Sequence, residues 1–335
     1  MGLPASFLGN ANSTEARARL VSAVARCAAI FRMHEVVVVD DAVGDGEGGG
    51  AEGYAGMFAR ILEYLETPQY LRRRLIPHHG DLALAGRLPP LDAPHQARKH
   101  ETPAFREGVV VHHHDDGTND VDADVGLDAP VRVSCADRQP AVDERVTVRM
   151  TATPPSLSTR DAPLDENGTY WGYRVRRCRG VYECLAKDGD KRRYDWIIGT
   201  SERGRPLDDG ALSPPRLVKK RHAKGKPVRI LLLFGGVRGL EAMHTLDGAR
   251  CASLLQSWGG GGSGGGKDPH IPGSEVARLC DGFVNFCPNQ GSRTIRTEEA
   301  IFIGLALMRD AAADAATAAQ ASALRPSKKR RKKEA

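Results

Sequence analysis

The sequence predicts an α/β protein whose alternation of helices and strands is interrupted by a β-rich insert. Three observations support this prediction. Near both ends of the chain, apolar residues recur at helical spacing between short apolar runs, and in between they recur at every second position. Polar or glycine-rich stretches also follow several apolar runs, as loops do at the carboxyl ends of parallel strands. We expect an α/β domain in two parts, residues 1–104 and 193–324, an insert over 105–192 and a basic tail over 325–335.

The first part of the chain is predicted to contain a helix, a buried strand and two further helices. Asn12 is the expected cap of the first helix. The buried stripe of this helix consists of Leu20, Val24, Cys27 and Phe31. Apolar residues 36–39 predict a buried parallel strand, because both faces of such a strand are covered. A loop rich in glycine and acidic residues at 41–53 leads to the second helix, and the third begins after Pro68.

In the insert the apolar residues alternate with polar ones, which predicts short strands. The predicted strands are Val109–Val111, Val131–Val133, Arg145–Met150 and Tyr170–Arg176. Neighbouring side chains of a strand point to opposite faces, so the apolar ones should fill a core and the arginines should lie outside. The expected outer residues are Arg145, Arg149, Arg174 and Arg176. This face is either an RNA-binding platform or the arginine-rich exterior of an ordinary small barrel, and both interpretations stay open.

Helix and strand alternation resumes near residue 194 with three apolar strands, at 196–199, 230–234 and 283–286. A loop follows each strand: Thr200–Gly204, Phe234–Gly239 and Asn285–Glu299. Ligands bind outside the carboxyl ends of strands in open α/β sheets, so these loops are the candidate ligand site. The last loop leads into a long helix that begins near Thr297. Its predicted buried stripe is Ile301, Leu305 and Met308.

The second loop taken alone does not identify a ligand. Its glycines fit a dinucleotide-binding turn, as in an oxidoreductase, or simply close packing of a strand on a helix. The pattern is not a complete G-x-G-x-x-G, and no matching acidic residue follows about 20 residues later. Residues 259–266 are instead a glycine-rich, linker-like insertion.

The third loop is more specific, because residues 285–301 closely resemble the carboxyl-terminal signature of the SPOUT family of RNA methyltransferases. Six further stretches resemble the same family: 33–38, 60–65, 68–72, 105–111, 170–173 and 199–204. The resemblance covers roughly residues 2–308 and implies a trefoil-knotted SPOUT methyltransferase domain with an inserted OB-like β-barrel, assembled as a homodimer. Members of the family have a strand before a Leu-Pro pair. Here Met1 and Gly2 directly precede that pair, so we expect the strand to be missing or truncated.

The resemblance also implies that S-adenosyl-L-methionine is the methyl donor and that ribosomal RNA is the substrate, at a uridine ring nitrogen. The implied donor-binding residues are Thr200, Arg203, Gly235, Gly236, Gly239, Asn285, Phe286, Gln290, Gly291, Ser292 and Thr294. Glycines let the main chain approach adenine, and amides and hydroxyls supply hydrogen bonds. Arg296 and Glu298 are the candidate catalytic residues, to stabilise an anionic base and to accept its proton. Glu298 and Glu299 also fit a helix-capping role. The alternative function is a non-catalytic RNA- or chromatin-associated scaffold that retains the pocket.

The net charge and the composition limit which partners and which cellular location are expected. Six basic residues and one glutamate at 328–334 carry five of the six net positive charges, so the rest of the chain is almost neutral. Such a tail predicts nuclear or nucleolar localisation. No apolar run approaches the roughly 18 residues that span a bilayer, so no membrane helix is expected. No metal site is predicted either, because the neighbouring side chains of His112–His114 would alternate between faces, and this segment fits a solvated loop better.

Overall fold

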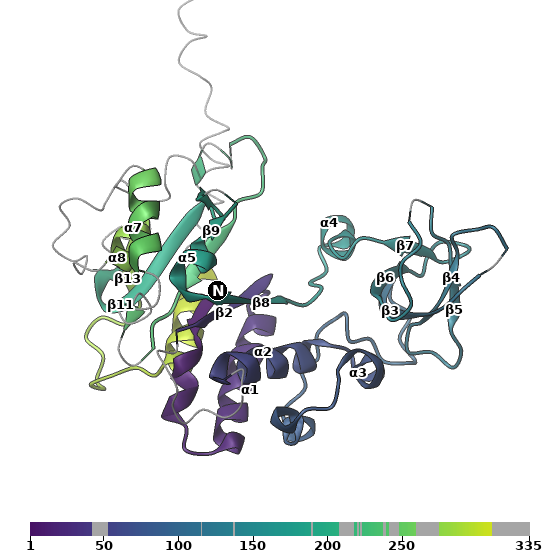
Figure 1. Cartoon of the computed structure of the whole chain (residues 1–335), viewed down its shortest axis with the longest axis horizontal. Coiled ribbons are helices and arrows are strands. Elements are labelled where there is room, and N and C mark those ends of the chain that lie inside the picture. Colours follow the sequence, from purple (N-terminus) through teal and green to yellow (C-terminus); the bar gives the residue numbers. More distant parts are fainter. Residues whose placement is uncertain are drawn as a thin grey trace, which may run out of the picture. The chain divides into compact units, whose positions relative to one another are not determined.

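The computed structural model describes residues 1–41, 53–114, 116–136, 138–188, 190–207, 218–219, 221, 223–236, 239–240, 248–258 and 275–309. The chain divides into two compact units (Figure 1). The first is Met1–Phe7, Val39–Gly46 and Cys178–Ala335, and the second is Leu8–Val38 and Glu47–Arg177. Helices, a largely parallel sheet and an antiparallel sheet are all present, so the predicted mixed α/β class is confirmed.

A six-stranded sheet contains the strands that carry the candidate loops. In sheet order these are β13 (Gly282–Asn285), β11 (Trp196–Pro206), β12 (Ile230–Leu233), β1 (Gly2–Pro4), β2 (Glu35–Asp40) and β8 (Arg174–Arg179). β11 runs parallel to both β12 and β13, and β12 runs parallel to β1. The middle residues of β2 and β12 are almost fully buried, as expected for short apolar strands inside a sheet.

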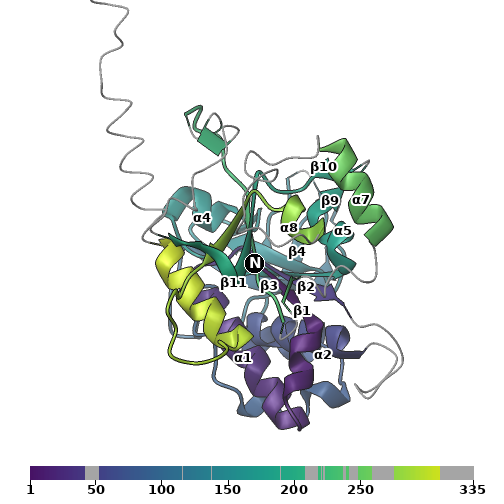
Figure 2. The same ribbon diagram turned by 90° about the vertical axis from the view of Figure 1, so that its left-hand side faces the viewer.

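Helices and a small hairpin accompany this sheet in the first unit. They are α5 (Gly180–Leu185), β9 (Ala186–Lys187), β10 (Lys191–Arg192), α7 (Gly248–Ser257), α8 (Glu275–Leu279) and a helix over residues 297–309. The last helix is yellow in Figure 2 and begins where the third loop ends. Its predicted stripe of Ile301, Leu305 and Met308 is buried, so the helical periodicity predicted the correct face.

The second unit contains a five-stranded antiparallel sheet. Its strands in order are β5 (Val131–Val133), β4 (Val121–Asp124), β3 (Phe105–His113), β6 (Arg145–Arg149) and β7 (Ser156–Ser158). Valines and alanines from four of these strands form one core, in which Val110, Val121 and Val148 are fully buried. Alternation along the strands therefore places apolar side chains inside, as the sequence predicted.

The helices of the second unit are α1 (Thr14–Ile30), α2 (Gly53–Glu66), α3 (Gln69–Leu75) and α4 (Ala162–Asn167). Three short 3-10 helices, η1 (Ala5–Asn10), η2 (Gly80–Leu82) and η3 (Ala85–Arg87), complete the described elements. Ser13 caps α1 by accepting a hydrogen bond from the main-chain N–H of Ala16. The prediction of Asn12 as the cap was therefore one residue off.

The strand expected to be missing or truncated is present as β1, a three-residue strand between β12 and β2 in which Gly2 pairs with Leu233. Two other predictions about strands are corrected by the structure. The strand predicted at 170–176 begins only at Arg174 and belongs to the six-stranded sheet. His112 and His113 lie in β3 and not in a loop.

Several predicted features lie outside the described residues, namely the loop over 42–52, the glycine-rich stretch 259–266 and the basic tail. Within the described part of the chain, no helix has both the length and the apolar character needed to cross a membrane.

Candidate functional site

The candidate site is built at one edge of the six-stranded sheet, where β11, β12 and β13 end. These three strands are parallel neighbours, so their carboxyl ends and the loops that follow them lie together. Cys280, just before β13, is fully buried beside Gly199 of β11. Burial raises the pKa of its thiol, and Sγ donates a hydrogen bond of 3.4 Å to the main-chain oxygen of Val276.

The first loop is a bulge within β11 and not a separate loop. Thr200 and Arg205 both register with Val284 of β13, so residues 201–204 bulge out between them. A side chain at the buried Gly204 would place its Cβ only 2.5 Å from the carbonyl carbon of Val284. Glycine is therefore required here because two main chains approach each other closely.

Asn285 connects the third loop to the first. Its Nδ2 donates a hydrogen bond of 2.8 Å to the main-chain oxygen of Glu202, within the bulge. Its Oδ1 accepts a hydrogen bond of 2.9 Å from the main-chain N–H of Cys287, which starts the turn after β13. The Asn285 side chain thus fixes the two loops to each other.

The second loop is a tight turn that needs its glycines for structural reasons. Gly239 has a positive φ of 78° and donates a hydrogen bond of 2.9 Å from its main-chain N–H to the oxygen of Gly236. A Cβ on Gly235 would lie 2.8 Å from the carbonyl carbon of Gly239. The structure therefore favours the close-packing interpretation of this loop over a dinucleotide turn. Val237 and Arg238 lie outside the described residues.

Thr297 connects the third loop to the second. Its hydroxyl donates a hydrogen bond of 3.0 Å to the main-chain oxygen of Gly235, and the residue is buried. Gly235 follows β12, whereas the third loop starts at the end of β13, and β11 lies between these two strands. The chain therefore crosses the carboxyl end of β11, and the three loops meet as the sequence predicted.

Within the third loop, several predicted donor-binding residues bond to the loop itself. Gln290 Nε2 donates to the main-chain oxygen of Ser292 at 3.0 Å, and Ser292 Oγ donates to that of Thr294 at 2.8 Å. Phe286 is half-buried against Gly304 of the following helix, where an added Cβ would lie 3.0 Å from the ring. Gly291 is exposed, and an added Cβ would meet no atom within 4 Å. The side chains order the loop, and Gly291 leaves space beside it.

The two candidate catalytic residues lie at the start of the helix over 297–309. Glu299 Oε2 accepts a hydrogen bond of 2.9 Å from the main-chain N–H of Arg296, so the capping interpretation is correct for Glu299. Glu298 is half-buried and the residue Arg296 is exposed. Among the described residues, no ion pair to either side chain is found.

Sequence reasoning missed three groups at this edge. The main-chain oxygen of Glu202 and the hydroxyl of Thr297 form the hydrogen bonds that join the loops. The sequence showed only that both are polar residues in loops after apolar strands. The third is Asp41, directly after β2, which is buried and accepts hydrogen bonds from both the main-chain N–H and the hydroxyl of Ser6. An added Cβ on Gly236 would lie 3.6 Å from that hydroxyl, so this pair borders the second loop.

The arginines predicted to form one RNA-binding face do not share a face. Arg174 and Arg176 belong to β8 of the six-stranded sheet, whereas Arg145 and Arg149 belong to β6 of the antiparallel sheet. Each is also paired with a carboxylate, and these partners are Glu66 and Glu107 for Arg145, Glu166 for Arg149, Asp161 for Arg174 and Glu35 for Arg176. The prediction failed because alternation along a strand does not reveal what covers its polar face.

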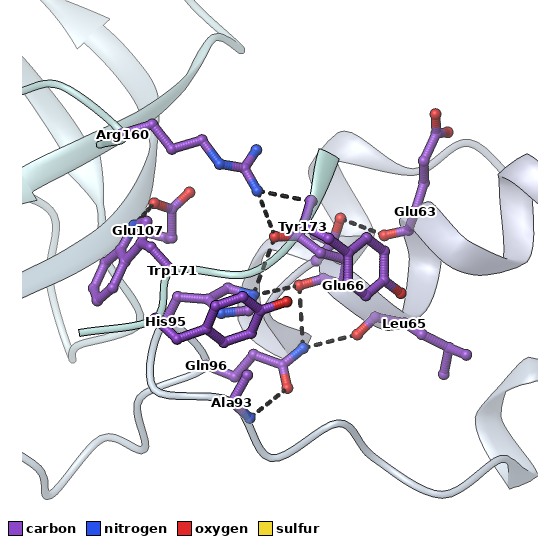
Figure 3. A network of polar contacts seen from close by, with 12 residues as sticks. Glu63, Leu65, Glu66, Ala93, His95, Gln96, Glu107, Arg160, Trp171 and Tyr173 are labelled. Carbon is purple, nitrogen blue, oxygen red and sulfur yellow. Dashed lines mark hydrogen bonds and ion pairs between the residues drawn. The ribbon is translucent and has the colours of Figure 1, made fainter. Parts of the chain in front are cut away.

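A buried polar network in the second unit contains Glu66, Glu107 and Arg160 (Figure 3). Arg145 forms ion pairs with both carboxylates of this network. Its guanidinium bonds to Glu66 of α2 at 2.6 Å and to Glu107 of β3 at 2.5 Å. Arg160 also bonds to Glu66 at 2.9 Å, and Trp171 donates its indole N–H to Glu107. Two carboxylates are thus matched by two guanidinium groups, and further hydrogen bonds satisfy the remaining oxygens.

Burial by itself would raise the pKa of Glu66, but its partners outweigh this effect. The charge of Arg145 and hydrogen bonds from His95 and Arg145 hold the pKa of this carboxyl well below its ordinary range. Gly172 passes so close that a Cβ there would lie 2.3 Å from Glu66 Oε1, and its φ is 77°. The network therefore depends on a glycine at this position.

Comparison with known proteins places these features in context. Residues 1–308 match the model of a protein family described as "Putative RNA methyltransferase". A human protein named 28S rRNA (uridine-N(3))-methyltransferase is 37% identical over 326 residues, which cover 92% of this chain and 77% of the relative. The mouse protein of the same name is 38% identical over 327 residues, covering 92% and 75%. An uncharacterised Halobacterium salinarum protein is 28% identical over 319 residues, covering 90% and 95%.

Proposed function

Because the chain belongs to this family of RNA methyltransferases, we propose that it methylates ring nitrogen N3 of a uridine in ribosomal RNA, with S-adenosylmethionine as the methyl donor. The human and mouse relatives carry this activity in their names. The observation that carries the proposal is the meeting of three loops at the carboxyl ends of β11, β12 and β13, joined through Asn285 and Thr297.

This edge of the sheet fits the donor chemically. Main-chain groups near Gly235 and in the third loop can bond the edge of adenine, because glycines there carry no side chain that blocks access. The donor-binding residues named from the sequence belong to these loops, and we propose that Asn285, Gln290 and Ser292 act by ordering the loop main chain. Bound S-adenosylmethionine would supply an electrophilic methyl group on a sulfonium.

For the chemical step we propose separate roles for Glu298 and Arg296. Uridine N3 would give its proton to Glu298, the proposed acceptor. Its electron pair would then displace the donor sulfur at the methyl carbon, with S-adenosylhomocysteine as the leaving group. Arg296, exposed at the start of the helix, would stabilise the negative charge that develops on the base. Glu299 keeps Arg296 in place through its capping hydrogen bond.

We propose the finer architecture on the same basis. The passage of residues 285–297 across the end of β11 supports a trefoil knot, since the loop lies between segments that come much earlier in the chain. The antiparallel sheet of β3 to β7, over residues 105–158, supports an OB-like insert that ends before β8 and is therefore shorter than the predicted range 105–192. A homodimer and nuclear localisation through the tail at 325–335 complete the proposal.

For RNA binding we propose that Arg149 and Arg174 contribute, and that Arg145 and Arg176 serve the fold. The ion pairs of Arg149 with Glu166 and of Arg174 with Asp161 are exposed, so exchanging the carboxylate for an RNA phosphate costs little. Arg145 is bound by two buried carboxylates, so separating it from them would cost more free energy than breaking an exposed pair.

The substitution Gly291→Trp tests the donor site. We expect it to abolish binding of S-adenosylhomocysteine in calorimetry, because the indole would fill the space beside the third loop. The matched control is Gly80→Trp, at another glycine where an added Cβ meets no atom within 4 Å. Unchanged affinity of the Gly291→Trp protein for S-adenosylhomocysteine would refute the proposed donor site.

Mass spectrometry of nucleosides from ribosomal RNA treated with the wild-type protein should detect 3-methyluridine. Absence of this nucleoside would refute the proposed substrate.

A further inference from the structure

A cluster of two histidines and one aspartate lies on the antiparallel sheet, and methyl transfer does not use it. His112 is on β3, His114 follows the strand end, and Asp122 is on β4. His114 Nε2 lies 2.9 Å from one carboxylate oxygen of Asp122, and His112 Nδ1 lies 4.0 Å from the other. One nitrogen or oxygen atom from each of the three residues lies within 4.8 Å of the others.

A β-bulge produces this arrangement. Val110 registers with Ala123 but His112 registers with Asp122, so Val111 is an extra residue in β3. Without the bulge, Val111 would lie opposite Asp122. Ala123 is buried in the core of the sheet, so Asp122 and its partner His112 point to the other face. His114 lies two residues after His112 and therefore shares this face. The sequence-based expectation considered only that neighbouring histidines alternate between faces, and not that every second one returns to the same face.

We propose that His112, His114 and Asp122 bind a divalent transition-metal ion, with Zn²⁺ as the favoured occupant. Imidazole nitrogens prefer such ions, whereas Mg²⁺ and Ca²⁺ prefer oxygen ligands alone. Ligands at about 2.0–2.2 Å from a tetrahedral Zn²⁺ lie roughly 3.3–3.5 Å from one another. The observed separations of 2.9 Å and 4.0 Å lie on either side of that value, so small side-chain rotations suffice.

The surroundings favour a cation with an open coordination position. The side chain of His112 is 65% exposed, and those of His114 and Asp122 are 23% and 30% exposed, so water can provide a fourth ligand. Arg132 registers with Asp122 on the neighbouring strand β5, but its guanidinium bonds to Asp116 at 2.7 Å and Asp120 at 3.0 Å. The Arg132 charge is thereby neutralised by two other carboxylates.

Metal titration of the untagged full-length protein tests this proposal. We expect one equivalent of Zn²⁺ by calorimetry, and one of Co²⁺ with visible absorption but no intense thiolate charge-transfer band. His112→Ala and Asp122→Asn should each weaken binding at least about tenfold, because even loss of outer-shell partners costs about 10–100-fold. The control His78→Ala replaces an exposed histidine elsewhere in the second unit and should bind normally.

A second measurement guards against misfolded variants. Zn²⁺ would link β3 to β4, so it should raise the Tm of the wild-type protein and of His78→Ala but not that of His112→Ala. Circular dichroism should show the same secondary structure in all three proteins. Identical isotherms for wild type and His112→Ala, a thiolate band in the Co²⁺ spectrum, or no uptake at metal concentrations matching the protein would each overturn the proposal.

Discussion

Arginines in two regions of this molecule differ in their surroundings: one region pairs its arginine with carboxylates, and the other exposes its arginines to solvent. In the second unit, Arg145 lies between two buried carboxylates. In the third loop, Arg293 and Arg296 are exposed, and no ion pair to either is found among the described residues. The comparison shows that an arginine paired with buried carboxylates is committed to the fold, while an arginine on a loop at the sheet edge can be exposed to solvent.

The strongest test of this contrast is Arg145→Ala. Removing the guanidinium leaves Glu66 and Glu107 buried with one cation fewer, and loss of one partner from a buried ion pair costs about 3–5 kcal/mol. Urea denaturation should therefore show a large fall in the free energy of unfolding. Arg74→Ala, which breaks the exposed pair with Asp143, should cost less than about 1 kcal/mol. Equal effects of the two substitutions would erase the distinction between buried and exposed pairs.

Arg296→Ala should show the reverse pattern. We expect methyl transfer to fall about 100-fold, the effect of removing one group that stabilises developing charge. Because Arg296 is exposed and the cap uses its main-chain N–H, the stability of the protein should hardly change. The measurements are single-turnover methylation with excess enzyme and urea denaturation. A variant that loses stability but retains its rate would place Arg296 with the structural arginines.

The buried network also predicts how stability depends on pH. The pKa of Glu66 is lower in the folded protein than in the unfolded chain, so its ionised form stabilises the fold at neutral pH. This contribution is lost as the pH falls below the unfolded value of about 4.3. Glu66→Gln should thus be less stable than wild type at pH 7, with the difference shrinking between about pH 5 and pH 3. A constant difference across that range would mean that folding leaves the pKa of Glu66 at its unfolded value.

The smallest predicted effect concerns RNA binding by the exposed arginines. The double substitution of Arg149 and Arg174 by alanine should flatten the dependence of log affinity on log salt by about one unit, since each phosphate contact to single strands contributes roughly 0.7. Donor affinity should not change. The control is Arg138→Ala, which breaks another exposed ion pair, with Glu144. If the double variant and this control have the wild-type slope, RNA binds elsewhere.

Much of the fold could be predicted from the sequence because local patterns specify it. Apolar periodicity identified the buried faces of β2, β6 and the helix over 297–309, since burial follows side-chain direction along an element. The three loops were also predictable, because parallel strands bring their carboxyl ends to one edge. The proposal of a donor site came from residues 285–301, whose order resembles a known family.

Only the tertiary structure decided how polar side chains are used. Arg145 and Thr147 alternate with buried valines as surface residues would, yet carboxylates from other elements bond to both, Glu66 to Arg145 and Glu107 to Thr147. A single extra residue in β3 likewise places His112 opposite Asp122. Sequence patterns record which face a side chain takes. Whether that face meets solvent, a carboxylate or another strand depends on residues distant in the chain, and a local pattern holds no information about them.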